Sequence, residues 1–232
     1  MNKFELLGVN VSATNLKETV VSVMEAIERK KKIYVCVCPV STVIDCRDSA
    51  DYRRIVNNAD IVTPDGMPVV ISGKIKGFKN ISRTYGPDLM LDLCDLSQDK
   101  GYRHYFFGGK EDNDKLLVES LRKRFPKLIV AGCFSPGERK LGELEDSAII
   151  EQINTSNCDV LWVGLGSPKQ DYWMANHREK LNAPVIIGVG AAFDFLSGAK
   201  PQAPLWMQRS GLEWLFRLCR EPKRLWRRYL IG

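Results

Sequence analysis

The first residue with the chemistry of a catalyst is Asp65, in the segment Thr63-Pro64-Asp65-Gly66. This segment ends a short apolar run, Ile61 to Thr63, that predicts a β-strand, so the aspartate stands where a strand gives way to a loop. A carboxylate in that place can accept a proton from a hydroxyl group as a general base. The same residues are also typical of a Pro-Asp-Gly turn whose aspartate caps the next helix, and both interpretations stand.

Two loops hold cations suited to phosphate. Arg83 lies in Ser82-Arg83-Thr84-Tyr85-Gly86, just before a predicted helix, where the arginine fork and the positive helix end both favour a diphosphate. A solvated side chain is the alternative for this arginine. Lys169 lies in Gly164-Leu165-Gly166-Ser167-Pro168-Lys169-Gln170 and points a cation at the end of another predicted strand. In the same segment Ser167 and Gln170 have the spacing of a helix-capping box, which explains Gln170 without a ligand.

Two glycine-rich turns permit close approach of the backbone to a ligand. Gly108 and Gly109 follow the predicted strand 102–107, but they do not complete the fingerprint of a P-loop or of a dinucleotide-binding fold. Tight-turn geometry explains these two glycines equally well. Gly190 precedes Asp194, an acid between two aromatic residues. Because a buried carboxylate needs donors, Asp194 either binds a ligand such as a uracil or ribose group or pairs with a cation inside the protein.

A regular alternation of apolar runs and amphipathic segments must position these residues. Strands are predicted at 33–38, 61–63, 102–107, 128–133, 160–165 and 185–189, after a short strand-like start at 3–11. Helices are predicted from 16 to the basic end at 29–32, then at 41–58, from 67, and at 87–98, 111–125, 143–154 and 168–181. The pattern predicts an α/β fold with a mostly parallel, Rossmann-like sheet and helices on both faces. Ligands of such sheets bind at the carboxyl ends of strands.

The pattern changes after Gly198, and we expect a catalytic α/β domain at 1–199 and a helical appendage at 200–232. Two amphipathic helices, split near Pro222, are predicted there. Eight of the chain's 34 Lys and Arg residues lie in the appendage against two acids, so it holds the whole net charge of +6. The eight are Lys200, Arg209, Arg217, Arg220, Lys223, Arg224, Arg227 and Arg228.

Basic helices with tryptophans at their boundary favour an anionic lipid surface. Arg209, Arg217 and Arg220 share one flank of the first predicted helix, from which they could also reach a diphosphate. Nucleic-acid binding would instead need charges spread along a groove and aromatic residues presented singly. Simple docking of the helices on the core, or an interface between copies of the chain, is the remaining interpretation.

The composition argues against several other classes of protein. The N-terminus lacks the apolar stretch of a signal peptide, and no run approaches the roughly eighteen apolar residues of a membrane-spanning helix. Seven cysteines without C-x-x-C spacing indicate reduced thiols and a cytoplasmic location, and only two histidines make a zinc site unexpected. Cys36 and Cys38 should share one face of a buried strand.

Five segments in series resemble the WecG/TagA/CpsF family, known as glycosyltransferase family 26. They are Thr63 to Pro68, Tyr85 to Met90, Gly164 to Gln170, Gly188 to Gly198 and Gln208 to Trp214. Each segment alone is a weak signal, but their order and spacing make the resemblance specific. It covers most of the chain, roughly from Asn10 to Leu230.

The resemblance implies an inverting, metal-independent enzyme without a cofactor. It would transfer N-acetylmannosamine, or a related hexosamine or uronic sugar, from UDP to undecaprenyl-diphosphate-linked GlcNAc, for teichoic acid or another cell-surface polysaccharide. The family's proposed general base falls on Asp65, its sugar- and phosphate-contacting arginine on Arg83, its glutamine on Gln170 and its nucleotide-associated aspartate on Asp194. The implied location is peripheral, on the inner face of the plasma membrane.

The chain departs from the family at Cys38-Pro39-Val40-Ser41-Thr42, where members often show Thr-Pro-Asn or Thr-Gly-Val. A threonine contact to the donor sugar therefore does not carry over, and the donor stays open. Without a metal, fixed cations such as Arg83 and Lys169 must hold the charge of the departing UDP. The literal D-x-D of Asp112-Asn113-Asp114 stands at a predicted helix start, so we interpret it as capping acids and expect no metal.

Two other function classes compete with this interpretation. An NAD-dependent Rossmann oxidoreductase suits the alternating pattern but lacks the glycine fingerprint and the ribose-binding acid that follows it. A non-catalytic adaptor for a membrane or a nucleic acid suits the basic tail. We expect an anionic membrane surface rather than nucleic acid as the partner, and a homo-oligomer stays open.

Overall fold

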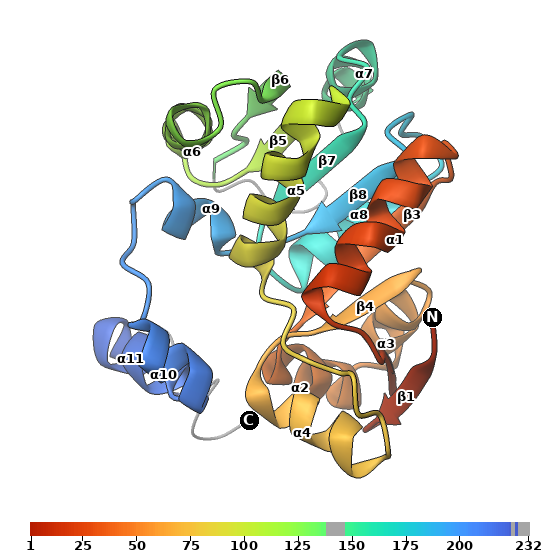
Figure 1. The fold of residues 1–232 in the computed structure, drawn as a ribbon, viewed down its shortest axis with the longest axis vertical. Coiled ribbons are helices and arrows are strands. Elements are labelled where there is room, and N and C mark those ends of the chain that lie inside the picture. Colours follow the sequence, from red (N-terminus) through yellow and green to blue (C-terminus); the bar gives the residue numbers. More distant parts are fainter. Residues whose placement is uncertain (138–146, 224–225, 227–232) are drawn as a thin grey trace.

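The computed structural model of the chain describes residues 1–137, 147–223 and 226, with the side chain of Arg209 left out (Figure 1). Its centre is a parallel sheet of six strands in the order β4-β3-β8-β7-β5-β6. The strands are β3 (Ile33–Cys38), β4 (Ile61–Pro64), β5 (Arg103–Gly108), β6 (Ile129–Phe134), β7 (Val160–Gly164) and β8 (Val185–Gly188). All six predicted strands of the sheet are confirmed, and their pairing is parallel throughout.

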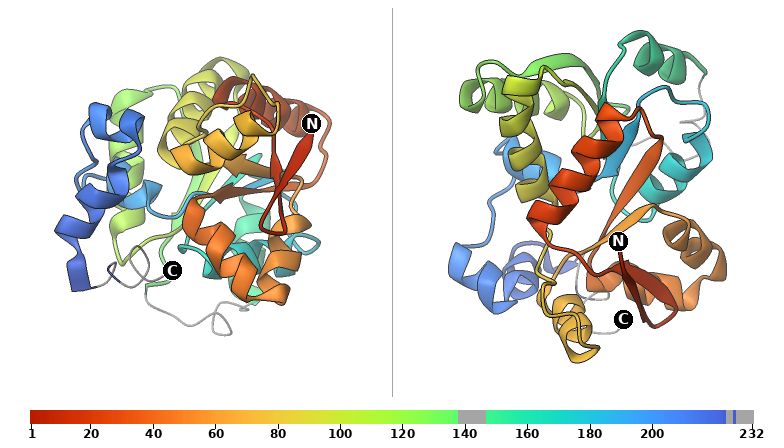
Figure 2. Two further views of the ribbon diagram at one scale, coloured as in Figure 1. Left: turned by 90° about the horizontal axis from the view of Figure 1, so that it is seen from below. Right: turned by 45° about the vertical axis from the view of Figure 1, so that its right-hand side comes forward.

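Helices cover both faces of this sheet (Figure 2). One core lies under α1 (Leu16–Glu28), α5 (Gly86–Lys100), α6 (Asn113–Arg124) and α9 (Ala192–Leu196). The other core lies under α2 (Val40–Asp48), α3 (Ala50–Asn57), α7 (Ser147–Thr155) and α8 (Lys169–His177). The predicted α/β fold with helices on both faces is therefore confirmed.

Strand side chains alternate between the two cores, as the two-residue period of a strand requires. Val35 and Val37 enter the core under α1 and α5, whereas Cys36 and Cys38 enter the opposite core. Both cysteines are fully buried free thiols on one face of β3, as predicted.

The segment 41–58 was expected to be one helix, but it forms α2 and α3. Ser49 leaves the helical conformation with φ −129° and ψ 107°, and its hydroxyl accepts a hydrogen bond from the Tyr52 backbone N–H at 3.2 Å. Serine competes for backbone donors in this way at helix starts, so the chain begins a new helix here.

The start of the chain is a hairpin rather than a single strand. Strands β1 (Lys3–Leu6) and β2 (Val9–Ser12) pair antiparallel through a turn in which Leu7 and Gly8 have positive φ. The Ser12 hydroxyl accepts a hydrogen bond from Val62 N–H on β4 at 3.1 Å. The hairpin thus covers the outer edge of β4, and α4 (Met67–Ile75) packs beside it.

The helical segment after residue 200 breaks near Pro222 as predicted, because α11 (Glu213–Arg220) ends at Arg220 and Glu221 leaves the helical conformation with φ −130° and ψ 57°, and it also breaks at Gly211. Helices α10 (Leu205–Ser210) and α11 are separated because Gly211 adopts a left-handed φ of 77°. A Cβ atom at this position would lie 3.2 Å from Cβ of Met67, so only glycine lets the turn approach α4 this closely. The second predicted tail helix falls largely outside the described residues. Of the helices described, none has the length and apolar character needed to cross a membrane.

One buried histidine, His104, should make the stability of the folded protein depend on pH. His104 on β5 is fully buried, and its Nδ1 accepts a hydrogen bond from the Trp162 indole N–H at 2.9 Å. The ring is therefore neutral with its proton on Nε2. Burial lowers the pKa of His104 to about 3.

We expect His104 to make the protein less stable in acid. The unfolded chain takes up a proton near the ordinary imidazole pKa of 6.5, whereas the folded protein resists it down to about pH 3. Within this window the free energy of unfolding should fall, as pH drops, by about 1.4 kcal/mol per pH unit from this residue alone. His104→Gln keeps an acceptor for Trp162 and removes the titration. Urea unfolding between about pH 6 and pH 4 should show a shallower slope for the variant, and equal slopes would contradict this assignment.

Candidate active site

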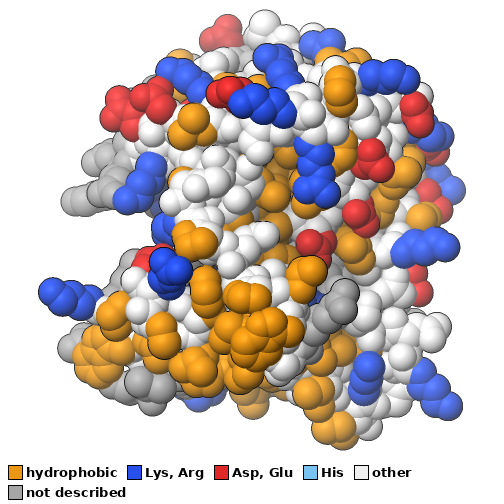
Figure 3. Space-filling model, turned by 60° about the vertical axis from the view of Figure 1, so that its left-hand side comes forward, with side chains coloured by type: hydrophobic (Ala, Val, Ile, Leu, Met, Phe, Trp, Pro, Cys, Tyr) orange, Lys and Arg blue, Asp and Glu red, His pale blue; other side chains and the backbone are white. Residues whose placement is uncertain are grey.

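A cleft of about 820 Å³ opens at the carboxyl ends of β4, β3, β8 and β7 and is walled on its far side by α10 and α11. The surface is hollowed beside a group of hydrophobic side chains (Figure 3). Six of the predicted site residues line the cleft: Asp65, Arg83, Gln170, Gly190, Arg217 and Arg220. Parallel strands end at this edge, as expected for a ligand site of such a sheet.

Asp65 directly follows β4, and its backbone N–H donates to the Cys38 carbonyl at 3.1 Å. The N-cap of α4 is Gly66, which makes no side-chain cap, so the interpretation of Asp65 as a helix cap is wrong. Its carboxylate instead turns into the cleft, where Oδ1 accepts a hydrogen bond from Arg83 Nε at 3.0 Å. Oδ2 has no hydrogen-bond partner within the described part of the chain.

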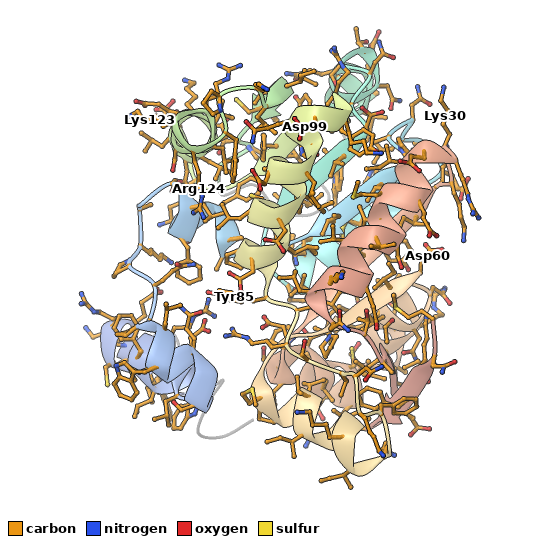
Figure 4. The ribbon with its side chains drawn as sticks, in the orientation of Figure 1. Lys30, Asp60, Tyr85, Asp99, Lys123 and Arg124 are labelled. Carbon is orange, nitrogen blue, oxygen red and sulfur yellow. The ribbon has the colours of Figure 1, made fainter. Side chains whose placement is uncertain are left out.

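Arg83 is held between two carboxylates rather than solvated. Besides its bond to Asp65, its Nη2 donates to Glu213 Oε2 on α11 at 2.6 Å. Its guanidinium carbon lies 4.1 Å from the ring centroid of Tyr85, the residue at the start of α5 that Figure 4 labels. The loop itself is fixed because Thr84 N–H donates to the Pro64 carbonyl at 2.9 Å. The alternative of a solvated Arg83 is therefore wrong.

The charged side chains of Asp65, Arg83 and Glu213 are mostly buried. Their exposed fractions are 14% for Asp65, 18% for Arg83 and 13% for Glu213. Burial raises the pKa of Asp65, and Arg83 opposes this effect without cancelling it, while Glu213 adds to it. Burial lowers the pKa of Arg83, but the two carboxylates more than offset that, so the guanidinium stays charged. A carboxylate with a raised pKa is a stronger base than an ordinary aspartate.

Glu213 is the site residue that sequence reasoning missed. Its Oε1 accepts from the Tyr85 hydroxyl at 3.3 Å and pairs with Arg217 Nε at 3.3 Å, while Oε2 holds Arg83. Both of its oxygens therefore have partners, whereas Asp65 keeps one oxygen without a hydrogen-bond partner among the described residues. One signal was available: Glu213 and Glu221 are the only acids among the charges of a strongly basic tail.

Gln170 joins two turns of the cleft wall. Its Oε1 accepts from the Gly190 backbone N–H at 2.9 Å, and its Nε2 donates to the Ser167 hydroxyl at 3.2 Å. The predicted capping box is wrong, because α8 begins at Lys169 after Pro168 and has no side-chain cap. Gly190 has a φ of 52°, which lets its N–H turn toward the glutamine.

Four other predicted residues do not line the cleft: Lys169, Asp194, Gly108 and Gly109. Asp194 on α9 pairs inside the protein, with Asn113 Nδ2 at 3.0 Å and Lys200 Nζ at 3.1 Å. These contacts supply the donors that its burial requires, as in the second of the two interpretations above.

The glycines after β5 serve close packing. A Cβ atom on Gly108, whose φ is 129°, would lie 2.6 Å from the backbone of Gly164 on β7. Gly109 donates its N–H to the Gly164 carbonyl at 3.0 Å. The two residues therefore seal the turn between neighbouring strands.

Two of the three predicted tail arginines reach the cleft. Arg217 and Arg220 line it from α11, and Arg217 lies over the ring of Phe195 at 4.9 Å. Lys200 lines the cleft as well and pairs with Glu221 at 3.2 Å. Arg209 lies on α10, and its side chain is outside the described part of the structure.

The D-x-D sequence lies at the start of α6, and none of its three residues lines the cleft. Asp112 is the N-cap residue of α6, where the interpretation as capping acids placed it, but its side chain makes no capping bond, and its Oδ1 accepts from Lys115 Nζ at 2.6 Å. Asp114 lies buried in the first turn. Over residues 1–137, 147–223 and 226, no group of three or more His, Cys, Asp or Glu side chains is placed to hold a metal.

Comparison with known proteins identifies the family of the chain. Residues 4–232 match the Glycosyl transferase WecG/TagA/CpsF family. The chain is 32% identical over 181 residues to an N-acetylglucosaminyldiphosphoundecaprenol N-acetyl-beta-D-mannosaminyltransferase of Bacillus subtilis (strain 168), covering 78% of this chain and 68% of the relative. It is 29% identical over 204 residues to the enzyme of the same name from Bacillus spizizenii, covering 88% and 77%. The chain is therefore a glycosyltransferase, not an oxidoreductase or an adaptor, and it belongs to the WecG/TagA/CpsF family.

Proposed function

We propose that this enzyme transfers N-acetylmannosamine, or a related hexosamine or uronic sugar, from UDP to undecaprenyl-diphosphate-linked GlcNAc. The product would enter teichoic acid or another cell-surface polysaccharide. The names of the two Bacillus relatives support the sugar and the acceptor. A cleft of about 820 Å³ has the size of a small-ligand site. The observation that carries the proposal is the mostly buried Asp65, which lines the cleft and is held by Arg83 through one oxygen, while its other oxygen has no hydrogen-bond partner among the described residues.

The geometry supports a single displacement. The second oxygen of Asp65 accepts the proton of the acceptor hydroxyl. At the same time the hydroxyl oxygen of the acceptor attacks the anomeric carbon of the donor sugar. The bond from this carbon to the diphosphate breaks in the same step, so the configuration inverts, and UDP leaves with the electron pair. Asp65 then releases its proton to solvent.

Fixed cations are proposed to hold the charge of the departing diphosphate. Arg217, Arg220 and Lys200 line the same cleft as Asp65, and Arg83 stands beside the base. Preorganised positive groups in a site that excludes water stabilise developing negative charge strongly. These side chains support a transfer that does not depend on a metal ion.

We further propose that residues 200–232 form an appendage that holds the enzyme on the inner face of the plasma membrane. Leu205 and Trp206 on α10 are 67% and 64% exposed, and Ile75 on the neighbouring α4 is 81% exposed. Hydrophobic side chains gather beside the hollow of the surface in Figure 3. Each basic residue near an anionic leaflet contributes about 1 kcal/mol, and apolar burial adds to it. This location would place the enzyme in the plane of its lipid-linked acceptor.

The direct test offers the full chain a panel of UDP-sugars with a short-chain GlcNAc-diphosphate lipid. We expect UDP-N-acetylmannosamine or a related UDP-sugar to extend the lipid by one residue, as seen by mass spectrometry, and the activity to survive EDTA. Release of UDP without extension for every donor would refute the proposed transfer. A strict need for Mg²⁺ or Mn²⁺ would refute the role of the fixed cations.

Asp65→Asn should lower kcat by roughly 10²–10⁴ because the amide cannot accept the hydroxyl proton. The affinity for UDP, measured by calorimetry, should stay nearly unchanged. Asp48→Asn makes the same change on the exposed surface of α2 and is the matched control. Near-normal turnover of the Asp65 variant would show that another group is the base.

Leu205→Glu combined with Trp206→Glu should abolish sedimentation with anionic liposomes, because both side chains are exposed and neither lines the cleft. Transfer to a short-chain, water-soluble acceptor should persist. Leu116→Glu changes an exposed leucine on α6, which lies apart from α10 in Figure 1, and should bind liposomes like the wild type. Undiminished sedimentation of the double variant would exclude α10 from the membrane contact.

A further inference from the structure

The two N–H groups that Arg83 uses are the pair with which arginine commonly grips one carboxylate. Nε and Nη2 lie on the same edge of the guanidinium, and this edge suits a bidentate bond to the two oxygens of a single acid. In this protein the two groups bind different carboxylates: Nε donates to Asp65 at 3.0 Å, and Nη2 donates to Glu213 at 2.6 Å. Asp65 therefore loses one oxygen to the arginine instead of two.

Glu213 is itself fixed from two directions. Tyr85, at the start of α5, donates its hydroxyl to Oε1 at 3.3 Å, and Arg217, one turn along α11, pairs with the same oxygen at 3.3 Å. The Tyr85 ring lies against the Arg83 guanidinium. With both oxygens engaged and most of its surface buried, Glu213 holds Arg83 Nη2 in a set position.

We propose that Glu213 is a positioning residue, which by holding Arg83 keeps one oxygen of Asp65 open for the acceptor hydroxyl. This inference rests on the proposed function of Asp65 as the base. It assigns to α11 a catalytic task beyond that of a cleft wall, because the base is ready only when this helix lies against the loop of Arg83.

The charge of Glu213 acts in the same direction as its position. Three charged groups act on Asp65: Arg83 in the loop before α5, and Glu213 and Arg217 on α11. Asp88 of α5 lies near Arg83. Burial raises the pKa of Asp65, the two arginines lower it, and Glu213 raises it. Loss of the Glu213 charge, with Arg83 closing on Asp65, should therefore lower the pKa of the base.

Glu213→Gln tests the proposal through the pH dependence of kcat/KM. We expect kcat to fall by about 10- to 100-fold and the acid limb of the profile to move to lower pH. Glu213→Asp retains the charge and should leave the acid limb near its wild-type position. Lower activity of Glu213→Gln with an unmoved acid limb would indicate a merely structural role and overturn the proposal.

A double-mutant cycle tests whether the effect passes through Arg83. A lysine cannot make the bidentate grip, so Glu213→Gln should cost much less in an Arg83→Lys background than in the wild type. Equal costs in both backgrounds would contradict the proposal. If Glu213→Gln does not fold by circular dichroism, Glu213→Ala, which removes the carboxylate altogether, gives the same comparison in the same two backgrounds.

Hydrogen exchange without substrate separates this inference from the proposed function. Glu213→Gln should speed amide exchange over residues 213–220, because a glutamine has one acceptor oxygen instead of two, so α11 loses the charge-assisted ion pair with Arg83 or the bond from Tyr85. Glu119→Gln, on the exposed surface of α6, is the control and should leave this exchange unchanged. If the wild type transfers no sugar, the proposed function fails, while unchanged exchange in Glu213→Gln refutes the contact itself.

Discussion

The shared guanidinium of Arg83 is the interaction on which the rest of the site depends. It joins a carboxylate at the end of β4 to a carboxylate on α11, and both bonds lie in a nearly dry setting. A buried charge left unpaired is costly, so these three side chains must stay together. In our proposal the arrangement also selects the base, because both oxygens of Glu213 are engaged, whereas Asp65 retains one.

The topology of the sheet explains how distant residues reach one cleft. The strands β4, β3, β8 and β7 are neighbours, although β3 and β8 are about 150 residues apart in the chain. The loops after β4 and β8 supply Asp65 and Gly190 at the same edge, and α8, which follows β7, supplies Gln170. The turn at Gly211 approaches Met67 of α4, and α11, which follows this turn, carries Glu213 to Arg83. Membrane contact by α10 and the chemistry at Asp65 would thus share one structural unit.

The periodicity of the sequence predicts the sheet well, because buried parallel strands are continuous apolar runs. It also places Asp65 and Arg83 correctly, since each stands beside the end of an element. Periodicity does not predict contacts between residues far apart in the chain. The bond between Asp194 and Asn113 joins residues 81 positions apart, and the bond between Glu213 and Arg83 joins residues 130 positions apart. Local competition by one serine or glycine, as at the breaks before α3 and α11, is equally hard to read from periodicity.

Our account depends on the Asp65 carboxylate remaining basic although it is hydrogen-bonded to Arg83. A ¹³C NMR titration of the side-chain carboxyl carbons, with the Asp65 signal assigned by its absence in an Asp65→Asn protein, measures this directly. Our account predicts a pKa for Asp65 above the ordinary aspartate value of 3.8, because burial outweighs the arginine. A pKa at or below that value would show that Arg83 neutralises the carboxylate, and it would contradict the role of Asp65 as general base.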